Sequence, residues 1–130
     1  MVINIQTNAK TEFIDITANV QDTLINLSAG NGLCFVFNPH TTAAITINEN
    51  ADPSVPVDIQ KVLNKIIPWE FNYEHLEGNS PAHVKSSLVG TSELIVIKDG
   101  RLQLGTWQGI FFCEFDGPRQ RKVHVHFYPG

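Results

Sequence analysis

The sequence predicts a single α+β domain over residues 1–130, with largely antiparallel β-sheets in a sandwich-like arrangement and two main helices. The length suits one hydrophobic core, and 42% of the residues are apolar, which is enough to fill it. Segments in which apolar and polar residues alternate, typical of strands, occupy both ends of the chain. Between them, apolar residues recur at helical spacing, and no repeat or linker divides the sequence.

The first elements are two strands and a helix. Residues 2–5 and 13–16 are rich in Ile, Val and Phe and flank the turn-like stretch TNAKT, which predicts a strand, a turn and a second strand. Thr17 is then a suitable N-cap for a helix that Gly30 ends. The core face of this helix is predicted from the spacing of Val20, Leu24 and Leu27.

Two more strands follow. The run GLCFVFN lies between Gly32 and Pro39 and is continuously apolar, which predicts a central strand buried on both faces. The next strand is TAAITIN. Because side chains alternate along a strand, one face carries Ala44, Thr46 and Asn48, and the other carries Ala43, Ile45 and Ile47.

The second main helix is predicted in ADPSVPVDIQKVLNKII. Ser54 is its expected N-cap, and Pro56 falls in the first turn, where a missing N–H is harmless. Its apolar residues recur at intervals of three and four: Val55, Ile59, Val62, Leu63 and Ile66. After a stretch without clear periodicity, residues 82–88 predict a short helix capped by Ser80.

The last third of the chain is predicted to be strands only. The segments SELIVIK, RLQLGTW, GIFFCEF and RKVHVHFYP are separated by short turns. Asp-Gly between the first two segments is typical of a tight hairpin.

Composition limits the functions to consider. A net charge of -4 argues against nucleic acid or an anionic membrane as a partner, since both need a basic face. No apolar run reaches the ~20 residues of a membrane span, and the N-terminus does not resemble a signal peptide. Charged residues make up only 17%, which suggests surface buried against other copies of the chain. Cys34 and Cys113 lie in apolar runs, so we expect two buried thiols in a reducing cytoplasm, although the sequence leaves a disulfide open.

Three histidines are candidate ligands. His40 follows a buried strand, and His75 and His83 flank the polar stretch LEGNSPA. Imidazoles with nearby carboxylates suit zinc or a similar divalent ion, but this spacing is not diagnostic, and an ordinary hydrogen-bonding role is the alternative. His124 and His126 lie on one face of a strand whose other face carries Val123, Val125 and Phe127. We expect that pair to face solvent or another subunit, and metal binding by two histidines on one face is the alternative.

Other candidate polar residues lie in the stretch NENADP, after the fourth predicted strand, and in GTWQG. Glu49 is the only candidate general base in NENADP, beside Asn50 and Asp52; the alternative is a loop that satisfies its own backbone groups. Trp107 and Gln108 stand between glycines, which permit close approach of a ligand or a neighbouring chain; the alternative for Trp107 is a place in the core.

A helix beginning near Ser80, with Lys85 one turn later, suits an anion, and Arg119 in RQRK can clamp a phosphate through its planar guanidinium. Cys113, in contrast, is expected to be a packed thiol.

Three long motifs, PHTTAAITINENADP, EGNSPAHVKSSLVG and GTWQGIFFCEFDGPR, together resemble the YjbQ-like family, whose members are often named secondary thiamine-phosphate synthases. The resemblance covers essentially the whole chain. It implies a β-sandwich-like subunit in a homotrimer, with sites between subunits. Carried over to this chain, the family's marked positions are His40, Thr41, Glu49, Asn50, Asp52, His75, Asn79, Ser80, His83, Lys85, Trp107, Gln108 and Arg119.

The function that the resemblance implies is the joining of a hydroxymethylpyrimidine diphosphate to a thiazole phosphate, as a main or secondary activity. In this interpretation His40, Glu49 and His83 are catalytic. His40, His75 and His83 meet as the ligands of a potential zinc or magnesium cofactor. The remaining marked positions bind substrate: Thr41, Asn50, Asp52, Asn79, Ser80, Lys85, Trp107, Gln108 and Arg119. The expected partners are other copies of the chain and a small anionic metabolite. A metal-dependent hydrolase and a non-catalytic trimer that binds a metabolite or a metal are the alternatives.

Overall fold

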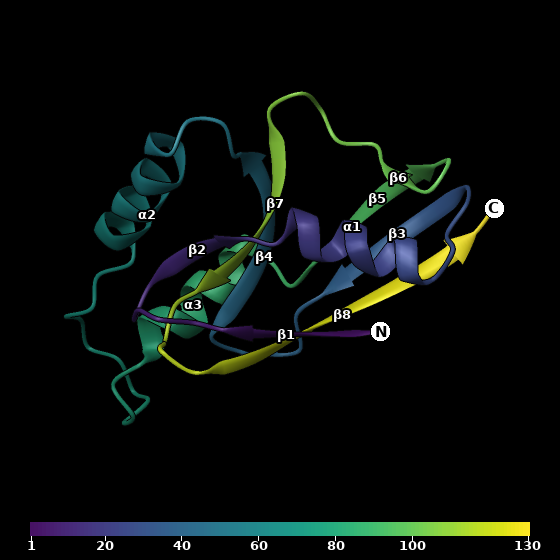
Figure 1. Cartoon of the computed structure of the whole chain (residues 1–130). Coiled ribbons are helices and arrows are strands. Elements are labelled where there is room, and N and C mark those ends of the chain that lie inside the picture. Colours follow the sequence, from purple (N-terminus) through teal and green to yellow (C-terminus); the bar gives the residue numbers. More distant parts are fainter.

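The computed structural model describes residues 1–130 and contains two β-sheets and three helices (Figure 1). In chain order the elements are β1 (Val2–Gln6), β2 (Glu12–Asp15), α1 (Thr17–Asn26), β3 (Gly32–Phe37), β4 (Ala43–Glu49), α2 (Ser54–Ile66), α3 (Ser80–Val89), β5 (Ser92–Lys98), β6 (Arg101–Leu102), β7 (Gln108–Glu114) and β8 (Gln120–Pro129). The predicted α+β class is confirmed. No helix is both long enough and apolar enough to cross a membrane.

Both sheets are antiparallel throughout. The larger has the strand order β1-β8-β3-β5-β6, so β3 is central as predicted. The smaller has the order β2-β7-β4. The first two strands therefore do not form a hairpin with each other: β1 pairs with β8, and β2 pairs with β7.

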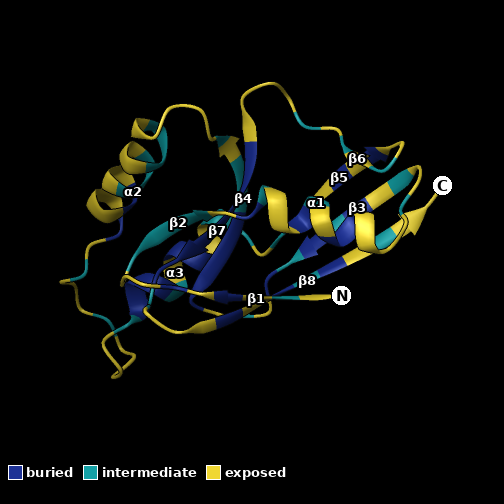
Figure 2. Ribbon diagram, in the orientation of Figure 1, coloured by how far each residue is buried: buried dark blue, intermediate teal, exposed yellow.

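The main core lies between the two sheets and is completed by α1. Figure 2 shows buried residues concentrated where β3, β4, β7 and β8 face one another. Ile45 of β4 and Val36 of β3 are fully buried there, together with Leu24 of α1. Apolar residues that alternate along each strand supply this layer because successive side chains point to opposite faces.

A second, smaller core covers the other face of the small sheet. Ala44, Phe111 and Cys113 pack there against Leu63 of α2 and Ala82 of α3. The small sheet is therefore the middle layer of the molecule, with the large sheet on one side and α2 and α3 on the other. The predicted alternation along β4 is confirmed, since Ala44 and Ile45 belong to different cores.

The outer face of the large sheet has no covering layer. β3 was predicted to be buried on both faces, but only the face of Cys34 and Val36 is buried, while Leu33 is exposed and Phe35 and Phe37 are half-buried. We call this uncovered surface the outer sheet face; its exposed apolar and aromatic residues are Val2, Leu33, Leu94, Val96 and Tyr128. His124 and His126 also lie here, opposite the buried Val123 and Val125, as predicted.

The helix starts differ from the prediction by one residue. Thr17, Ser54 and Ser80 are the first helical residues, not the N-caps. The carboxylate of Asp15 accepts the Thr17 N–H at 2.9 Å, and that of Asp52 accepts the Ser54 N–H at 2.9 Å. An acid two residues earlier thus takes the capping role that the hydroxyl residue was expected to have.

Element lengths also differ. The expected short third helix, α3, has 10 residues, as many as α1, so there are three main helices and not two. The predicted strand RLQLGTW is reduced to Arg101–Leu102. The Asp-Gly turn before it is confirmed: Asp99 and Gly100 both have positive φ, as a two-residue hairpin turn requires.

The apolar faces of α1 and α2 are only partly buried. Leu27 lies beyond the end of α1 and is exposed, and on α2 only Leu63 is buried, whereas Val62 and Ile66 are exposed. The helical spacing predicted the helices correctly but overestimated how many of their apolar side chains are buried within one chain.

Candidate functional site

A polar pocket lies where the chain enters β4, and we call it the histidine–arginine pocket. Its volume is about 350 Å³, and no large apolar side chain lines it. The loop before β4, the start of α3 and the start of β8 supply its walls, which are Pro39, His40, Thr41, Thr42, Glu77, Asn79, His83, Arg119 and Arg121. The structure therefore brings together five of the predicted site residues, namely His40, Thr41, Asn79, His83 and Arg119.

His40 is held in one orientation by backbone groups. Its Nε2 accepts a hydrogen bond from the Lys122 N–H at 2.9 Å, and Asn38 Oδ1 accepts the His40 N–H at 3.0 Å. Burial, and then the nearby charge of Arg121, lower the pKa of His40 below its ordinary value. The ring is therefore neutral near pH 7, and because Nε2 is an acceptor, Nδ1 carries the proton and can donate to a ligand.

A buried ion pair lies under the pocket. Arg121 Nε donates to Glu114 Oε1 at 2.8 Å, and Arg121 Nη2 donates both to Glu114 Oε2 and, at 2.9 Å, to Thr42 Oγ1. The Thr7 hydroxyl donates to Glu114 Oε1 at 2.7 Å. Burial by itself raises the pKa of Glu114, but the hydrogen bonds from Arg121, Thr7 and the Asp116 N–H lower it overall. Arg121 Nη1 makes no hydrogen bond in the chain, so this guanidinium can still donate to a ligand in the pocket.

A second arginine lies at the pocket rim. Arg119 donates from Nε to the Asp116 carbonyl oxygen at 2.9 Å and from Nη2 to Asp116 Oδ2 at 3.0 Å. Asn79 Nδ2 donates to the same carboxylate oxygen at 2.9 Å. Asn79 Oδ1 is buried and has no hydrogen-bond partner. A buried acceptor without a partner is costly.

The three predicted metal ligands are only partly assembled. The rings of His75 and His83 lie 5.2 Å apart, and His75 Nε2 is 3.8 Å from Glu77 Oε2. No group of three His, Cys, Asp or Glu side chains is close enough to hold an ion within one chain. His40 also uses Nε2 for the Lys122 N–H. The side chains of a single subunit therefore do not fit a three-histidine ion site.

Another predicted group lies at the opposite end of β4. Glu49 pairs with Gln108 across the small sheet, and the Asn50 N–H donates to the Trp107 carbonyl oxygen at 3.0 Å. Glu49 Oε2 accepts the Asp52 N–H at 3.2 Å. A seven-residue strand spans roughly 20 Å, so within one chain Glu49 does not lie beside His40 and His83, the residues with which it was expected to form the catalytic group.

Lys85 lies outside the pocket. Its side chain is buried, its Nζ donates to Asn64 Oδ1, and it lies 5.1 Å from the centre of the Trp69 ring and 5.7 Å from that of Phe115. Burial, and then the charge of Lys10, lower the pKa of Lys85. Ser80 is buried in the first turn of α3 and does not line the pocket.

Sequence reasoning missed Arg121, Thr42 and Glu114. The signal was present in the alternation of β8: Arg121 shares its face with Val123 and Val125, which are core residues. A charge on the buried face of a strand needs a partner, and the only acid in the apolar strand GIFFCE is Glu114.

The whole chain, residues 1–130, matches the model of the family described as UPF0047 protein YjbQ-like. The chain belongs to this YjbQ-like family. It is 55% identical to a UPF0047 protein of Methanocaldococcus jannaschii over 121 residues, covering 93% of this chain and 88% of that one. It is 48% identical to the UPF0047 protein YugU of Bacillus subtilis over 124 residues, covering 95% and 94%.

Solved structures of other YjbQ-like proteins have the same fold. A YugU orthologue from Clostridium acetobutylicum superposes with a TM-score of 0.96 at 51% identity, covering 98% of this chain and 99% of that one. A YjbQ-like protein of unknown function from Sulfolobus solfataricus gives 0.95 at 30% identity, covering 100% and 96%. The YjbQ-like fold is thus retained where about two thirds of the residues differ.

Proposed function

We propose that the histidine–arginine pocket binds the phosphate or diphosphate group of a small metabolite. The observation that supports this most directly is the set of unpaired donors on its walls: Arg121 Nη1, His40 Nδ1–H and the outer edge of Arg119. Guanidinium groups match the geometry of phosphate oxygens, and donors in a partly buried site bind anions more strongly than donors in open solvent.

Each group has a distinct role in the proposed site. Glu114 compensates the charge of Arg121 and fixes the plane of its guanidinium. Nη1 is therefore already oriented, and little side-chain freedom is lost when a ligand binds to it. Arg119 is held by Asp116 and contributes charge at the rim. The partnerless Asn79 Oδ1 can accept a hydrogen bond from a hydroxyl of the ligand or from a protonated phosphate.

We infer that the reaction served by this pocket is the thiamine-phosphate synthase reaction that the family resemblance implies. In that reaction the nitrogen of a thiazole phosphate attacks the methylene carbon of a hydroxymethylpyrimidine diphosphate. A C–N bond forms, and the C–O bond breaks with its electron pair leaving on diphosphate. Arg119, Arg121 and His40 would stabilise the charge on the leaving diphosphate. Glu49 and Trp107 would take part only if a neighbouring subunit brought them to the pocket.

We also propose that the chain forms a homotrimer. The outer sheet face is apolar and uncovered, and further exposed apolar residues lie away from it on α2 (Val62 and Ile66) and on α3 (Val84 and Leu88). Two different patches on one chain suit a cyclic assembly, because in a ring each subunit presents one surface to one neighbour and a different surface to the other. Val96→Asp should dissociate the trimer in sedimentation velocity, whereas Asn19→Asp on the exposed side of α1 should not. A monomeric wild-type protein would contradict the proposal.

A metal-dependent hydrolase is the second candidate, and the contact between His75 and His83 is the observation that favours it. Metal analysis of the tag-free protein and of His83→Ala tests this function. Near-stoichiometric zinc or another divalent ion that is lost in the variant would support hydrolysis. If the wild-type protein contains no metal, the hydrolase is excluded and anion binding remains as the function of the pocket.

Diphosphate binding, measured by isothermal titration calorimetry, tests the primary proposal. Arg119→Ala should weaken binding by about tenfold or more, since a charge-assisted hydrogen bond contributes about 1.5–3 kcal/mol. Arg101→Ala, which removes an exposed arginine from β6, is the matched control and should bind as the wild type does. Equal binding by both variants would refute the assignment of the pocket. Formation of thiamine phosphate from the two substrates then tests the reaction, and a non-catalytic trimer would bind diphosphate without forming product.

We further infer a reducing, cytoplasmic setting, because Cys34 and Cys113 are free, buried thiols in separate cores.

A further inference from the structure

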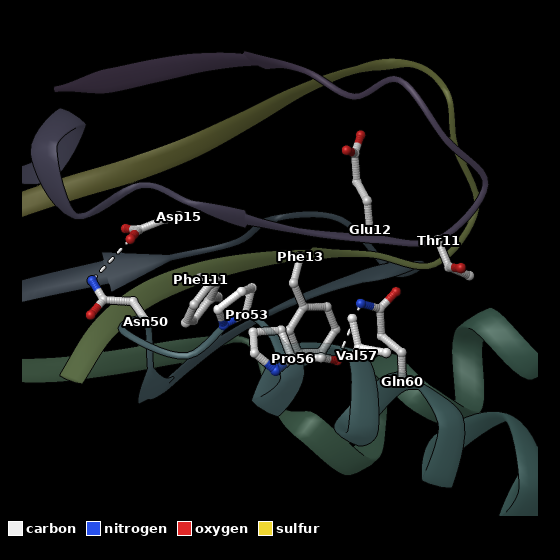
Figure 3. Close-up of a pocket in the computed structure, with 10 residues that line it drawn as sticks. All are labelled: Thr11, Glu12, Phe13, Asp15, Asn50, Pro53, Pro56, Val57, Gln60 and Phe111. Carbon is white, nitrogen blue, oxygen red and sulfur yellow. Dashed lines mark hydrogen bonds between the residues drawn. The ribbon is translucent and has the colours of Figure 1, made fainter. Parts of the chain in front are cut away.

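A second pocket lies between β2 and α2, on the far side of the small sheet from the main core (Figure 3). We call it the β2–α2 pocket. Its volume is about 390 Å³, within the range of small-molecule sites. Its lining residues are Thr11, Glu12, Phe13, Asp15, Asn50, Pro53, Pro56, Val57, Gln60 and Phe111. Of these, only Asn50 was predicted from the sequence, and for a different pocket.

The centre of the β2–α2 pocket is apolar. The rings of Phe13 and Phe111 have their centres 6.1 Å apart and are tilted by 44°, and Figure 3 shows Pro53, Pro56 and Val57 beside them. Val57 remains 47% exposed although it is apolar. Aromatic and proline rings provide flat walls, and such walls bury most surface when the ligand is itself a flat ring.

The polar groups around this centre include three with a free acceptor position, on Asp15, Asn50 and Gln60. Asp15 accepts two hydrogen bonds from Thr17 and one from Asn50 Nδ2, which leaves an acceptor position on its carboxylate. Gln60 Nε2 donates one hydrogen bond to the Pro56 carbonyl oxygen at 3.2 Å, which leaves its second N–H and the acceptor Oε1 free. Asn50 likewise keeps Oδ1 without a partner in the chain.

The charge of the β2–α2 pocket is negative. No Lys, Arg or His lines it. Burial raises the pKa of Asp15, but the hydrogen bonds from Thr17 and Asn50 lower it overall, so the carboxylate is ionised near pH 7. The carboxylate of Glu12 points away from the Phe13 ring in Figure 3 and accepts the Asn8 N–H, so it adds charge at the rim and no contact at the centre.

We propose that the β2–α2 pocket binds a small ligand with a flat heteroaromatic ring and exocyclic N–H donors, in neutral or cationic form. The ring would lie against Phe13 and Phe111, and its N–H groups would donate to Asn50 Oδ1, Asp15 and Gln60 Oε1. An anion is disfavoured, because the Asp15 carboxylate opposes it and no Lys, Arg or His lines the pocket to compensate that charge. The proposal is independent of the anion-binding function, because arginines line the histidine–arginine pocket whereas no cationic side chain lines the β2–α2 pocket.

Chemical-shift mapping by ¹H–¹⁵N NMR tests this site with 4-aminopyridine as the probe and pyridine-4-carboxylate as the matched anion. A fragment of this size should bind with a Kd of about 1 mM. We expect saturable shifts at Phe13, Asp15, Asn50 and Gln60 with the amine and none there with the carboxylate. Intermolecular NOEs from the probe's ring protons to the Phe13 ring should place the ring at the pocket centre.

Two lysine substitutions form a matched pair. Val57 is exposed and lines the β2–α2 pocket, whereas Asn19 is exposed on α1 and does not line it. Val57→Lys introduces a cation at the site and should weaken binding of 4-aminopyridine by about fivefold or more, whereas Asn19→Lys should leave it unchanged.

Any of three results would overturn the proposal: no saturable shifts in the wild type, equal binding of the carboxylate at the same residues, or shifts centred elsewhere, such as at the histidine–arginine pocket. The NOEs are measured on the wild type, so the test stands even if Val57→Lys fails to fold.

Discussion

The buried pair formed by Glu114 and Arg121 allows a quantitative test of how the site is supported. Glu114 is fully buried and accepts four hydrogen bonds, from Thr7, the Asp116 N–H and two nitrogens of Arg121. Glu114→Gln removes the negative charge and places an NH₂ group where an acceptor is needed. Arg121 is 3% exposed, so its charge would then be buried without a partner. Breaking such a pair costs about 3–5 kcal/mol.

In a domain of this size that loss corresponds to a decrease in Tm of roughly 10–15 °C. Urea unfolding followed by tryptophan fluorescence at pH 7 measures it, at one protein concentration because assembly adds to stability. Glu70→Gln, at an exposed acid, is the control and should change the free energy of unfolding by less than about 0.5 kcal/mol. The double replacement Glu114→Leu with Arg121→Met should recover most of the loss, because it leaves no unpaired buried charge.

The pH dependence provides an independent check. The pKa of Glu114 is lower in the folded protein than its ordinary value of 4.5, so the unfolded chain binds the proton more tightly. The stabilisation is therefore complete above about pH 4.5 and is lost as the pH falls through the folded-state pKa. Acid should destabilise the wild type more steeply than Glu114→Gln. A loss below about 1 kcal/mol for Glu114→Gln at pH 7, with parallel acid profiles, would refute the reasoning.

Three further predictions concern other buried groups. The pKa of His40 is lowered in the fold, so its contribution to stability is complete above its ordinary value of 6.5 and is lost as the pH falls through the lower folded-state pKa. Urea unfolding between pH 7 and pH 5 should therefore show a smaller loss for His40→Gln than for the wild type, and equal losses would contradict this. Lys85→Met removes a buried cation whose only hydrogen-bond partner is a neutral amide, so it should leave stability unchanged or raise it by about 1 kcal/mol without affecting diphosphate binding. If Lys85→Met instead weakened diphosphate binding in calorimetry as much as Arg119→Ala, Lys85 would belong to the binding site. Burial raises the pKa of the Cys34 thiol to about 11 and raises that of Cys113 further, so an aromatic disulfide reagent should label neither until urea unfolds the chain. Rapid labelling of the native protein would show that one thiol is accessible.

Local sequence patterns predicted most of the elements but not how far their faces are buried. The strand SELIVIK and its Asp-Gly turn depend on neighbouring residues alone, and both were predicted correctly. Helical spacing on α2 predicted an apolar face, yet Val62 and Ile66 are exposed in the chain. Periodicity says that a face is apolar and cannot say which molecule covers it, which is why the same error arose for β3.

For the candidate site too, part could be predicted from local sequence and part could not. The motif PHTT and the NSPAH stretch each carried recognisable polar groups, and the structure brings His40, Asn79 and His83 to one pocket. The interpretation failed where it treated neighbours in sequence as neighbours in space. A strand is extended, so β4 carries Glu49 to the end of the sheet opposite His40.

The sequence by itself determined the α+β class, the positions of most strands and helices, the buried thiols and the family, because all of these follow from local spacing and residue type. Only the tertiary structure decided that β1 and β2 join different sheets, that Arg121 meets Glu114 beneath His40, and that a pocket without a cationic side chain opens between β2 and α2. These contacts join residues far apart in the chain. They depend on which strands pair and which faces pack, and neither is encoded in any short stretch of sequence.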